Sequence, residues 1–596
     1  MFLTKSSYKS FDAFKIFFKA TPVTATLDIL LSIIDALLRM LFIALATAYF
    51  VDTAIAVLQG TQPRGDIYIP LIILIAVMGA NRIIMSVILL LMARHRLVLR
   101  HRLNPEFVQR HAVLDYKHIE NTDSWELISR ATKDPMNSIL MGFSGYSSIM
   151  KTAVSIIAIM GLIISHVWWA AFAIFAFSAP MLWLSVKAGQ KNYQAERDAE
   201  KFNRRTTYLD EVISSRENID ERTVFNYGEA VINDWYKQFE AGRLLQLKVR
   251  FKMTLMTRAS GIILILIGIL VALTLVGPVI NGELSAGMFM GIISAILAMI
   301  QRIGWEVSYS IEQLARGREY MKDLTAFVSL SQAEGAMDEP DPEPLPFKSL
   351  EFKNVSFKYP SGERYVLERL SFKLDGGRHY AFVGKNGTGK TTITKLLTGL
   401  YHEYEGEILI NGKELRTYPA GSIRAMFSVV YQDFARYFIS FEDNITIGDI
   451  ANKPHADDIR KVAGKAGLDE LVAGLKSGMS TALGKIKENG QDISGGEWQR
   501  IAIARSLISR APVKILDEPT AALDPVAESH VYEEFEKLMR GKTTIFISHR
   551  LGSTKLADEI LVIDNGKIAE RGSHEELITA NGLYTEMFEA QKGWYQ

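Results

Sequence analysis

The sequence contains no cysteine, which excludes disulfides, thiolate metal sites and thiol nucleophiles but leaves the redox compartment open. An excess of charge of one sign is also lacking, because basic and acidic residues balance to a formal net charge of +1. A balanced chain has no overall attraction to nucleic acid. We therefore expect no nucleic-acid partner, and the local basic clusters need another explanation.

The N-terminus lacks the pattern of a cleaved secretory signal. Polar and mixed residues precede the first apolar run, and no small-residue cleavage pattern follows it. We expect this first run to remain in the protein as a membrane helix.

Long apolar sequence is abundant before position 315. Six runs of about 20 residues have the length that a helix needs to cross a hydrocarbon core of about 30 Å. Long buried helices of a soluble protein are the alternative, but six runs with so few charges favour membrane spans. The runs are 28–51, 69–93, 146–164, 167–186, 259–280 and 288–310.

Basic residues predict the orientation of these spans. They precede the first span, follow the second and follow the fourth, whereas the connections at 52–67 and 281–287 carry little positive charge. Cytoplasmic loops are enriched in lysine and arginine, so we expect a multi-pass protein of the lipid bilayer with a cytoplasmic N-terminus and two long cytoplasmic loops. The basic residues are Lys5, Lys9, Lys15, Lys19, Arg94, Arg96, Arg100, Arg102, Arg110, Lys187, Lys191, Arg197, Lys201, Arg204 and Arg205.

A proline-rich acidic stretch at 334–346, EGAMDEPDPEPLP, separates two regions of different composition. Proline cannot continue a helix, so this stretch predicts a linker. Beyond it, EFKNVSFKYP alternates like a strand, and Asn565-Gly566 is typical of a hairpin turn. We therefore expect a six-span transmembrane domain at 1–315, a linker at 316–346 and an α/β domain at 347–596.

A glycine-rich segment follows the apolar run HYAFV and precedes the helix-like ITKLLTGL. Its pattern, G-x-x-x-x-G-K-T, is typical of a loop whose backbone N–H groups surround phosphates. Its lysine would neutralise phosphate charge, and the hydroxyl of the following threonine could ligate Mg²⁺. A flexible surface loop is the alternative, but the flanking strand and helix agree with phosphate binding. The candidates are Gly384, Lys385, Asn386, Gly387, Thr388, Gly389, Lys390, Thr391 and Thr392.

Two carboxylates, Asp517 and Glu518, follow the apolar run Val513-Lys-Ile-Leu. A strand that ends in this way suits a Mg²⁺–nucleotide site, where Asp517 would hold the metal and Glu518 would polarise the attacking water. Taken alone, the pair fits a solvated turn equally well. It indicates a nucleotide site only in combination with the other motifs.

Between these motifs lies Ile493-Ser-Gly-Gly-Glu497, where the chain resembles the ABC transporter superfamily across essentially its whole length. The segment is similar to the family's signature sequence. The order of motifs also matches, with a glutamine loop at Gln432 before the signature, and Asp524 and His549 after the acidic pair. The resemblance implies a half-size exporter, in which a six-helix all-α transmembrane domain precedes an α/β P-loop nucleotide-binding domain, expected in a bacterial inner membrane with the ATP-binding domain cytoplasmic.

The resemblance further implies that two ATP molecules, each with Mg²⁺, are held between two such domains. The partner would be a second copy of the chain or a paralogous half-transporter. Ser494 and the backbone donors of Gly495 and Gly496, expected at a helix N-terminus, would offer their dipoles to the γ-phosphate in the other subunit's phosphate loop.

The remaining roles come from the same resemblance. Tyr359 would stack on adenine, although a strand tyrosine packed on its neighbours is the alternative. Gln432 would sense nucleotide and Mg²⁺ while touching the membrane part, and Asp524 would belong to the loop after the acidic pair. Glu518 and His549 are expected to be catalytic with Gln432, and His549 would contact the γ-phosphate.

The signature differs from the family's usual sequence at Glu497, where glutamine is common. A carboxylate there could place an extra negative charge near the triphosphate and weaken closure of the dimer, unless the side chain points away or is neutralised. We expect Glu497→Gln to keep or raise ATPase activity.

Two loops expected in the cytoplasm, around 120–125 and 222–227, match the positions where exporters place short helices that dock on the ATPase domains. Contact with the Gln432 region is expected. The residues of the loops are not diagnostic, so this expectation depends on position alone.

Ionisable side chains inside membrane spans usually face a protein interior or an aqueous cavity. Asp35 with Arg39, and Arg302 with Glu306, have the i,i+4 spacing of helix pairs that satisfy each other. Arg82 has no obvious local partner and is the best candidate for contacting an anionic group of a substrate.

The residues around the signature look more like those of bacterial lantibiotic-type peptide exporters than those of multidrug pumps. We therefore expect export of a peptide, without a peptidase domain before the membrane part. Export of a lipid, a lipid-linked glycan or a drug is the alternative, and an ATP-gated channel or regulator is a distant one.

Overall fold

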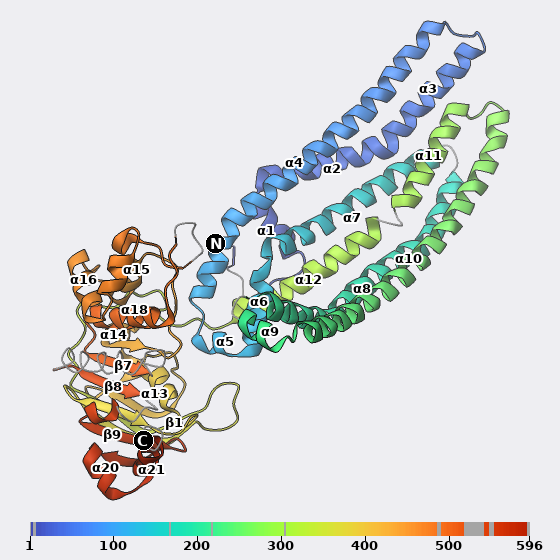
Figure 1. The fold of residues 1–596 in the computed structure, drawn as a ribbon. Helices are drawn as coiled ribbons and strands as arrows, with labels where there is room; N and C mark the ends of the chain where they lie inside the picture. Colours follow the sequence, from blue (N-terminus) through green and yellow to red (C-terminus); the bar gives the residue numbers. More distant parts are fainter. Residues whose placement is uncertain are drawn as a thin grey trace. The chain divides into compact units, whose positions relative to one another are not determined.

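The computed structural model describes residues 2–3, 7–165, 168–215, 218–302, 306–484, 490–517, 541–547 and 553–592. The chain divides into two compact units (Figure 1). The first unit comprises 1–111 and 126–329, and the second comprises 112–125 and 330–596. Each unit is described by itself.

The first unit is made of helices, and α4, α7, α8, α10 and α12 are much longer than those of an ordinary soluble domain (Figure 1). Pro22 and Pro135 occupy the first turn of α2 and α7, where no N–H donor is needed. The carboxylate of Asp134 accepts from the backbone N–H of Asn137 at 3.2 Å and caps α7. The helices are α1 (Asp12–Ala20), α2 (Pro22–Leu37), the π-helical η1 (Leu38–Phe42), α3 (Ile43–Leu58), η2 (Arg64–Ile67), α4 (Tyr68–Ala112), α7 (Pro135–Ile164), α8 (Trp168–Ser214), α9 (Ile219–Phe225), α10 (Gly228–Ile280), α11 (Ala286–Arg302) and α12 (Ser308–Ser329).

Three helical stretches among the described residues are long and apolar enough to cross a membrane, namely Pro22–Leu58, Arg64–Ala112 and Pro135–Ile164. They include the first three expected spans. The fourth and fifth expected spans fall on α8 and α10, and the sixth falls on α11 and the start of α12. The helical N-terminal region expected from the sequence is thus confirmed.

Close packing joins α3 to α11 in the first unit. Gly287 and Gly291 of α11 lie against the α3 backbone, and a Cβ on Gly291 would come within 2.7 Å of the carbonyl oxygen of Ala44. The carboxylate of Asp52 accepts from the backbone N–H of Gly287 at 2.7 Å and from the hydroxyl of Ser285 at 2.5 Å. Only residues without side chains allow this approach.

The described residues of the second unit form two sheets. One is antiparallel, in the order β2-β1-β4-β5, and the other has the order β10-β9-β3-β8-β7-β6, in which only β10 runs against its neighbour. The turn between β9 and β10 has Asn565 and Gly566 at positive φ, as the hairpin prediction requires. The strands are β1 (Ser349–Phe357), β2 (Leu367–Asp375), β3 (His379–Val383), β4 (Glu405–Ile410), β5 (Lys413–Glu414), β6 (Phe427–Val430), β7 (Val513–Asp517), β8 (Thr543–Ile547), β9 (Glu559–Asp564) and β10 (Lys567–Gly572).

Helices and short turns surround these sheets. They are α5 (Tyr116–Glu120), α13 (Lys390–Leu397), η5 (Leu415–Thr417), α14 (Ala420–Met426), α15 (Phe441–Thr446), η6 (Ile447–Asp449), α16 (Ala456–Lys465), α17 (Asp469–Gly474), η7 (Gly478–Ser480), α18 (Gly495–Ile508), η8 (Ser553–Leu556), α20 (His574–Ala580) and α21 (Leu583–Lys592), while α6 (Thr122–Lys133) spans the boundary of the units.

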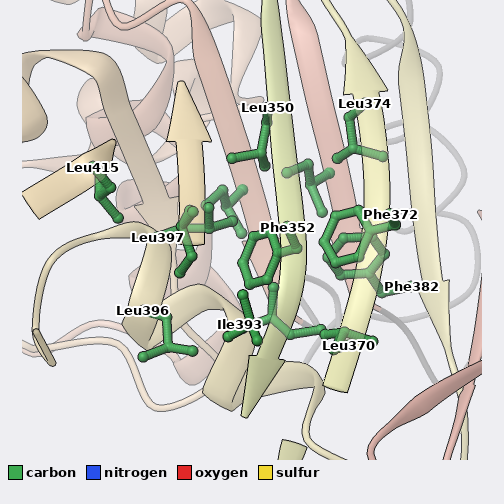
Figure 2. Packing of buried hydrophobic residues seen from close by; sticks show 14 of the residues in the cluster. Leu350, Phe352, Leu370, Phe372, Leu374, Phe382, Ile393, Leu396, Leu397 and Leu415 are labelled. Atoms are coloured by element: carbon green, nitrogen blue, oxygen red, sulfur yellow. The ribbon is translucent and has the colours of Figure 1, made fainter. Parts of the chain in front are cut away.

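An apolar core joins the two sheets to α13 (Figure 2). The rings of Phe352 and Phe372 stack at 4.5 Å between centroids, and Phe382 of β3 meets Phe372 edge-on at 5.7 Å. Leu396 of α13 is fully buried in the same cluster. This packing fixes β3 against α13, and the glycine-rich loop connects these two elements.

The segment 112–125 pairs with residues 331–333, in the middle of the expected linker. Leu114 forms an antiparallel bridge with Gln332, and the N–H of Ala333 donates to the carbonyl of Val113 at 2.9 Å. The hydroxyl of Ser331 also donates to the carboxylate of Asp115. The first of the two loops expected in the cytoplasm therefore belongs to the second unit.

The acidic proline-rich stretch lies along α14. The carboxylate of Asp341 accepts from the hydroxyl of Ser422 at 2.5 Å, and Arg424 donates to the carbonyl of Gly335 at 2.9 Å. Before this stretch, α12 continues to Ser329, so a helix occupies the first part of the range expected to be a linker.

Candidate nucleotide-binding site and its neighbouring loop

The glycine-rich loop connects β3 to α13, as the sequence predicts. Gly384, Gly387 and Gly389 have positive φ, and a Cβ on Gly384 would collide with the carbonyl oxygen of Ile563. The ammonium of Lys390 is buried under the loop, where it donates to the carbonyls of Gly384 and Lys385 at 2.7 and 2.8 Å. The loop therefore presents its N–H groups and a fixed positive charge at the start of a helix, which is the arrangement that binds phosphates.

Two oxygen ligands for a cation meet beside this loop. The hydroxyl of Thr391, in the first turn of α13, donates to the carboxylate of Asp517 at 3.2 Å, and Asp517 is the last residue of β7. Hydroxyl and carboxylate oxygens suit Mg²⁺, which keeps several waters and uses few protein ligands next to phosphates. The described residues thus fit a Mg²⁺ ion bound with the nucleotide.

Tyr359 lies just after β1 and is hydrogen-bonded to α13, the helix that begins at the phosphate loop. Its hydroxyl hydrogen-bonds to that of Thr392 at 2.9 Å, and its ring meets the ring of Tyr401 edge-on at 5.6 Å. The ammonium of Lys395 lies over the Tyr359 ring at 5.2 Å from its centroid. The ring is therefore held close to the helix that begins at the phosphate loop.

The segment containing α5 contacts the same group of side chains. The carboxylate of Glu120 accepts from the ammonium of Lys395 at 2.5 Å and from the hydroxyl of Tyr401, and Lys117 pairs with Glu403. Burial, followed by the hydrogen bond to Glu120, raises the pKa of the Tyr401 phenol. The expected docking loop thus lies against the surface around Tyr359, with contacts to Lys395, Tyr401 and Glu403, while its expected contact with Gln432 stays a prediction. Sequence reasoning missed Lys395 and Tyr401 because nothing in their local pattern marks them.

The signature segment begins α18, and Ser494 is its N-cap. The hydroxyl oxygen of Ser494 accepts from the N–H of Glu497 at 3.2 Å, and the carboxylate of Glu497 accepts from the N–H of Ser494 at 2.6 Å. These two bonds form a capping box. Glu497 therefore folds back on the helix terminus, with Gly495 and Gly496 providing the first turn.

Arg505 connects α18 to the segment that follows Gln432. Its guanidinium donates to the backbone carbonyl and the side-chain oxygen of Asn444 and to the carbonyl of Ala435, at 2.8, 2.5 and 2.7 Å. Burial lowers the pKa of Arg505. Sequence reasoning missed Arg505, although a basic residue on the buried side of an apolar helix could have indicated that its guanidinium binds buried oxygen atoms. The side chain of Gln432 itself is exposed.

Three expected site residues, Glu518, Asp524 and His549, lie outside the described residues. Their positions stay predictions. The described part brings together the phosphate loop, Thr391, Asp517 and Tyr359, while Ser494 begins a separate helix of the same unit.

The expected pair in the first membrane helix is present. Arg39 donates to the carboxylate of Asp35 at 3.3 Å, and the amide of Asn81 donates to the same oxygen at 2.8 Å. Arg82 is exposed. The second expected pair cannot be described, because the side chain of Arg302 lies outside the described residues.

Comparison with known proteins agrees with this geometry. The family model for ABC transporters matches residues 367–521. An ATP-dependent lipid A-core flippase of Pseudomonas fluorescens is 30% identical over 506 residues, covering 83% of this chain and 81% of the relative. The subtilin transport ATP-binding protein SpaT of Bacillus subtilis is 29% identical over 500 residues, covering 84% of this chain and 81% of that protein.

A solved structure of a bacterial Atm1-family ABC exporter with ATP bound has the same fold, with a TM-score of 0.76 and 22% identity over 96% of this chain and 98% of that one. The chain belongs to the ABC transporter family and is one of its exporters. It is therefore an integral membrane protein that couples ATP hydrolysis to transport.

Proposed function

We propose that this exporter moves an amphipathic molecule with an anionic group, such as a phosphate-bearing lipid, out of the cytoplasmic side of a bacterial inner membrane. The observation that carries the proposal is the distribution of charge in the membrane helices. Asp28 and Asp35 are each only 2% exposed, whereas the side chain of Arg39 is 39% exposed, Arg82 is exposed and Lys151 is half-buried. Within the expected spans 28–51, 69–93 and 146–164, the charges that stay accessible are positive, whereas the partly accessible acids Asp52 and Glu306 lie outside these three spans.

Ionisable groups in a membrane are costly and are usually functional. Arg39 is held by Asp35, so its guanidinium is fixed in place at the π-helical turn η1, and such turns are frequent at functional sites. A carboxylate or phosphate on a substrate would replace part of the hydration that these cations lose in the membrane. The lipid A-core flippase relatives are consistent with a lipid of this kind.

Peptide export is the second candidate. The likeness to the subtilin transport protein favours it, as do the residues around Gly495. The carboxylates of an acidic peptide would pair with the same cationic side chains as a lipid phosphate. The two candidates therefore differ in whether a peptide or a lipid carries the negative charge.

ATP would drive the transport in a homodimer. Ser494, Gly495 and Gly496 would meet the γ-phosphate held by the partner's phosphate loop, and Thr391 with Asp517 would hold Mg²⁺, which supplies charge neutralisation there. Glu518 would orient the attacking water, His549 would contact the γ-phosphate, Gln432 would sense the bound nucleotide, and Asp524 would lie at the subunit contact.

The second cytoplasmic loop supports a dimer. Its helix α9 exposes apolar side chains at the tip, with Val224 at 76% and Phe225 at 71% exposure. Exposed apolar groups gathered on a short helix mark a contact surface. We propose that this tip docks on the ATPase domain of the partner.

The test is ATPase stimulation in nanodiscs by a phosphate-bearing lipid, a zwitterionic lipid, an acidic peptide and a neutral drug. We expect the phosphate-bearing lipid to stimulate ATP hydrolysis. Arg82→Gln and Lys151→Gln should each raise the lipid concentration that gives half-maximal stimulation at least about threefold, because each removes roughly one hydrogen bond to the lipid. Arg100→Gln, on the cytoplasmic part of α4, is the matched control. Stimulation by peptide alone would favour the second candidate, and equal stimulation of the Gln variants would remove the role of these cations. Ion conductance in a planar bilayer would indicate a channel instead.

A further inference from the structure

A cavity of about 220 Å³ lies beside Tyr359 in the second unit. One wall is the segment after β1, including Tyr359 and Gly362, and the other wall is the first cytoplasmic loop, including Glu120 and Asn121. Because the Tyr359 hydroxyl is bonded to Thr392 in the phosphate-loop helix, a nucleotide whose phosphates bind that loop would bring its base to this region.

On the wall formed by the loop, the side-chain amide of Asn121 has a hydrogen-bond donor that is not used. Its oxygen accepts from the N–H of Ser124 at 2.9 Å, which fixes the amide orientation and leaves the Nδ2 group directed elsewhere. Among the described residues, Nδ2 has no hydrogen-bond partner, and Asn121 is half-buried at the cavity. Both carboxylate oxygens of the neighbouring Glu120 are already used, one by Lys395 and one by Tyr401.

We propose that Asn121 reads the edge of the nucleotide base that stacks on Tyr359. An amide donor matches a ring-nitrogen acceptor of adenine, whereas the corresponding position of guanine carries an N–H donor and would repel it. Stacking on an aromatic ring tolerates every base, so Tyr359 supplies affinity and Asn121 supplies the preference for adenine.

Asn121 immediately precedes α6, and α6 is followed in the chain by the membrane helix α7. The residue proposed to recognise the base is therefore close in sequence to the transmembrane domain. The inference depends on ATP hydrolysis and on the placement of the base at Tyr359. It does not depend on which substrate is exported, so a failure of the substrate proposal would leave it intact.

The experiment measures kcat/KM of the full chain in nanodiscs, without added substrate, for ATP and for GTP. Asn121→Asp keeps the oxygen that caps α6 but replaces the amide donor with an acceptor that suits the N–H groups of guanine. We expect the ratio of kcat/KM for ATP to kcat/KM for GTP to fall at least about tenfold. Asn121→Asp removes the hydrogen bond to adenine and offers guanine a charge-assisted hydrogen bond in its place. Asn121→Ser, which can also cap a helix, should lower the ratio by about threefold.

Two controls separate base reading from general damage. Asp123→Asn, in the same loop but away from the cavity, should leave the ratio unchanged, and Tyr359→Ala should raise KM for both nucleotides without changing the ratio. The proposal is overturned if Asn121→Asp and Asn121→Ser keep the wild-type ratio. It is equally overturned if Tyr359→Ala leaves both KM values unchanged, since the base would then lie elsewhere.

Discussion

Glu497 offers the sharpest test of how the signature segment works. In the structure its carboxylate caps the N–H of Ser494 at 2.6 Å, so the acid is occupied by its own helix terminus. Glu497→Gln keeps an oxygen acceptor at this place and removes the charge. Glu497→Ala removes the acceptor as well, and the two variants therefore separate capping from charge.

The size of the two effects follows from the usual energies of helix capping and of charge at a helix N-terminus. Loss of a capping interaction costs typically about 1 kcal/mol, which corresponds to about a fivefold change in the population of the ordered terminus. The favourable interaction of a carboxylate with a helix N-terminus is about 0.3–1 kcal/mol. Glu497→Gln loses only this favourable charge interaction, and in the proposed dimer the loss would be offset by reduced repulsion of the triphosphate bound by the partner. We expect Glu497→Gln to retain or raise turnover and Glu497→Ala to lower it about fivefold.

The assay is ATP turnover in nanodiscs across a range of ATP concentrations, together with thermal unfolding of the full chain. Glu497→Ala should lower the Tm of the ATPase domain by about 2–4 °C, as expected for a domain of this size. A severe loss of turnover in Glu497→Gln would refute the reasoning, because the negative charge would then be required. Equal activity in all three proteins would show that the capping box has no role in turnover.

Three further predictions concern other parts of the chain. Glu518→Gln should nearly abolish ATP turnover while preserving ATP binding, so that a closed dimer accumulates in size-exclusion chromatography; an undiminished rate would contradict the assigned role. Cysteines at Lys117 and Glu403 should be joined by a short bifunctional maleimide in this cysteine-free chain, with either single variant as control, and failure to cross-link would contradict the docking of the loop. Burial lowers the pKa of His574 below 6.5, so the unfolded chain binds the proton more readily and stability should fall as the pH drops from 6.5 toward the lowered pKa; His574→Gln should flatten this slope in thermal unfolding, and an unchanged slope would exclude the histidine.

The sequence predicted those features whose causes are local. The phosphate loop needs glycines at positive φ between a strand and a helix, and Gly384 to Thr391 has that pattern within a few residues. The hairpin at Asn565 and the pair of Asp35 with Arg39 are equally local. Each was confirmed because sequence spacing alone brings the groups together.

Contacts between distant segments were not predictable from one sequence. Lys395 and Glu120 are far apart in the chain, and neither carries a pattern that indicates the other. The capping box shows a different failure. The helix N-terminus at Ser494 was expected, but the hydrogen bond of the Glu497 carboxylate to the Ser494 N–H was not, although the two residues have capping-box spacing.

The glycines between α3 and α11 have a mechanical consequence. At Gly287 and Gly291 the carbonyl groups of Ala48 and Ala44 lie directly against the backbone of α11, with no side chain between them. Around this contact, apolar side chains of both helices, among them Ala44 and Ile292, pack in one buried cluster. Any motion that separates α3 from α11 during transport must therefore break the two hydrogen bonds that Asp52 accepts from Gly287 and Ser285 and expose part of this cluster to its surroundings.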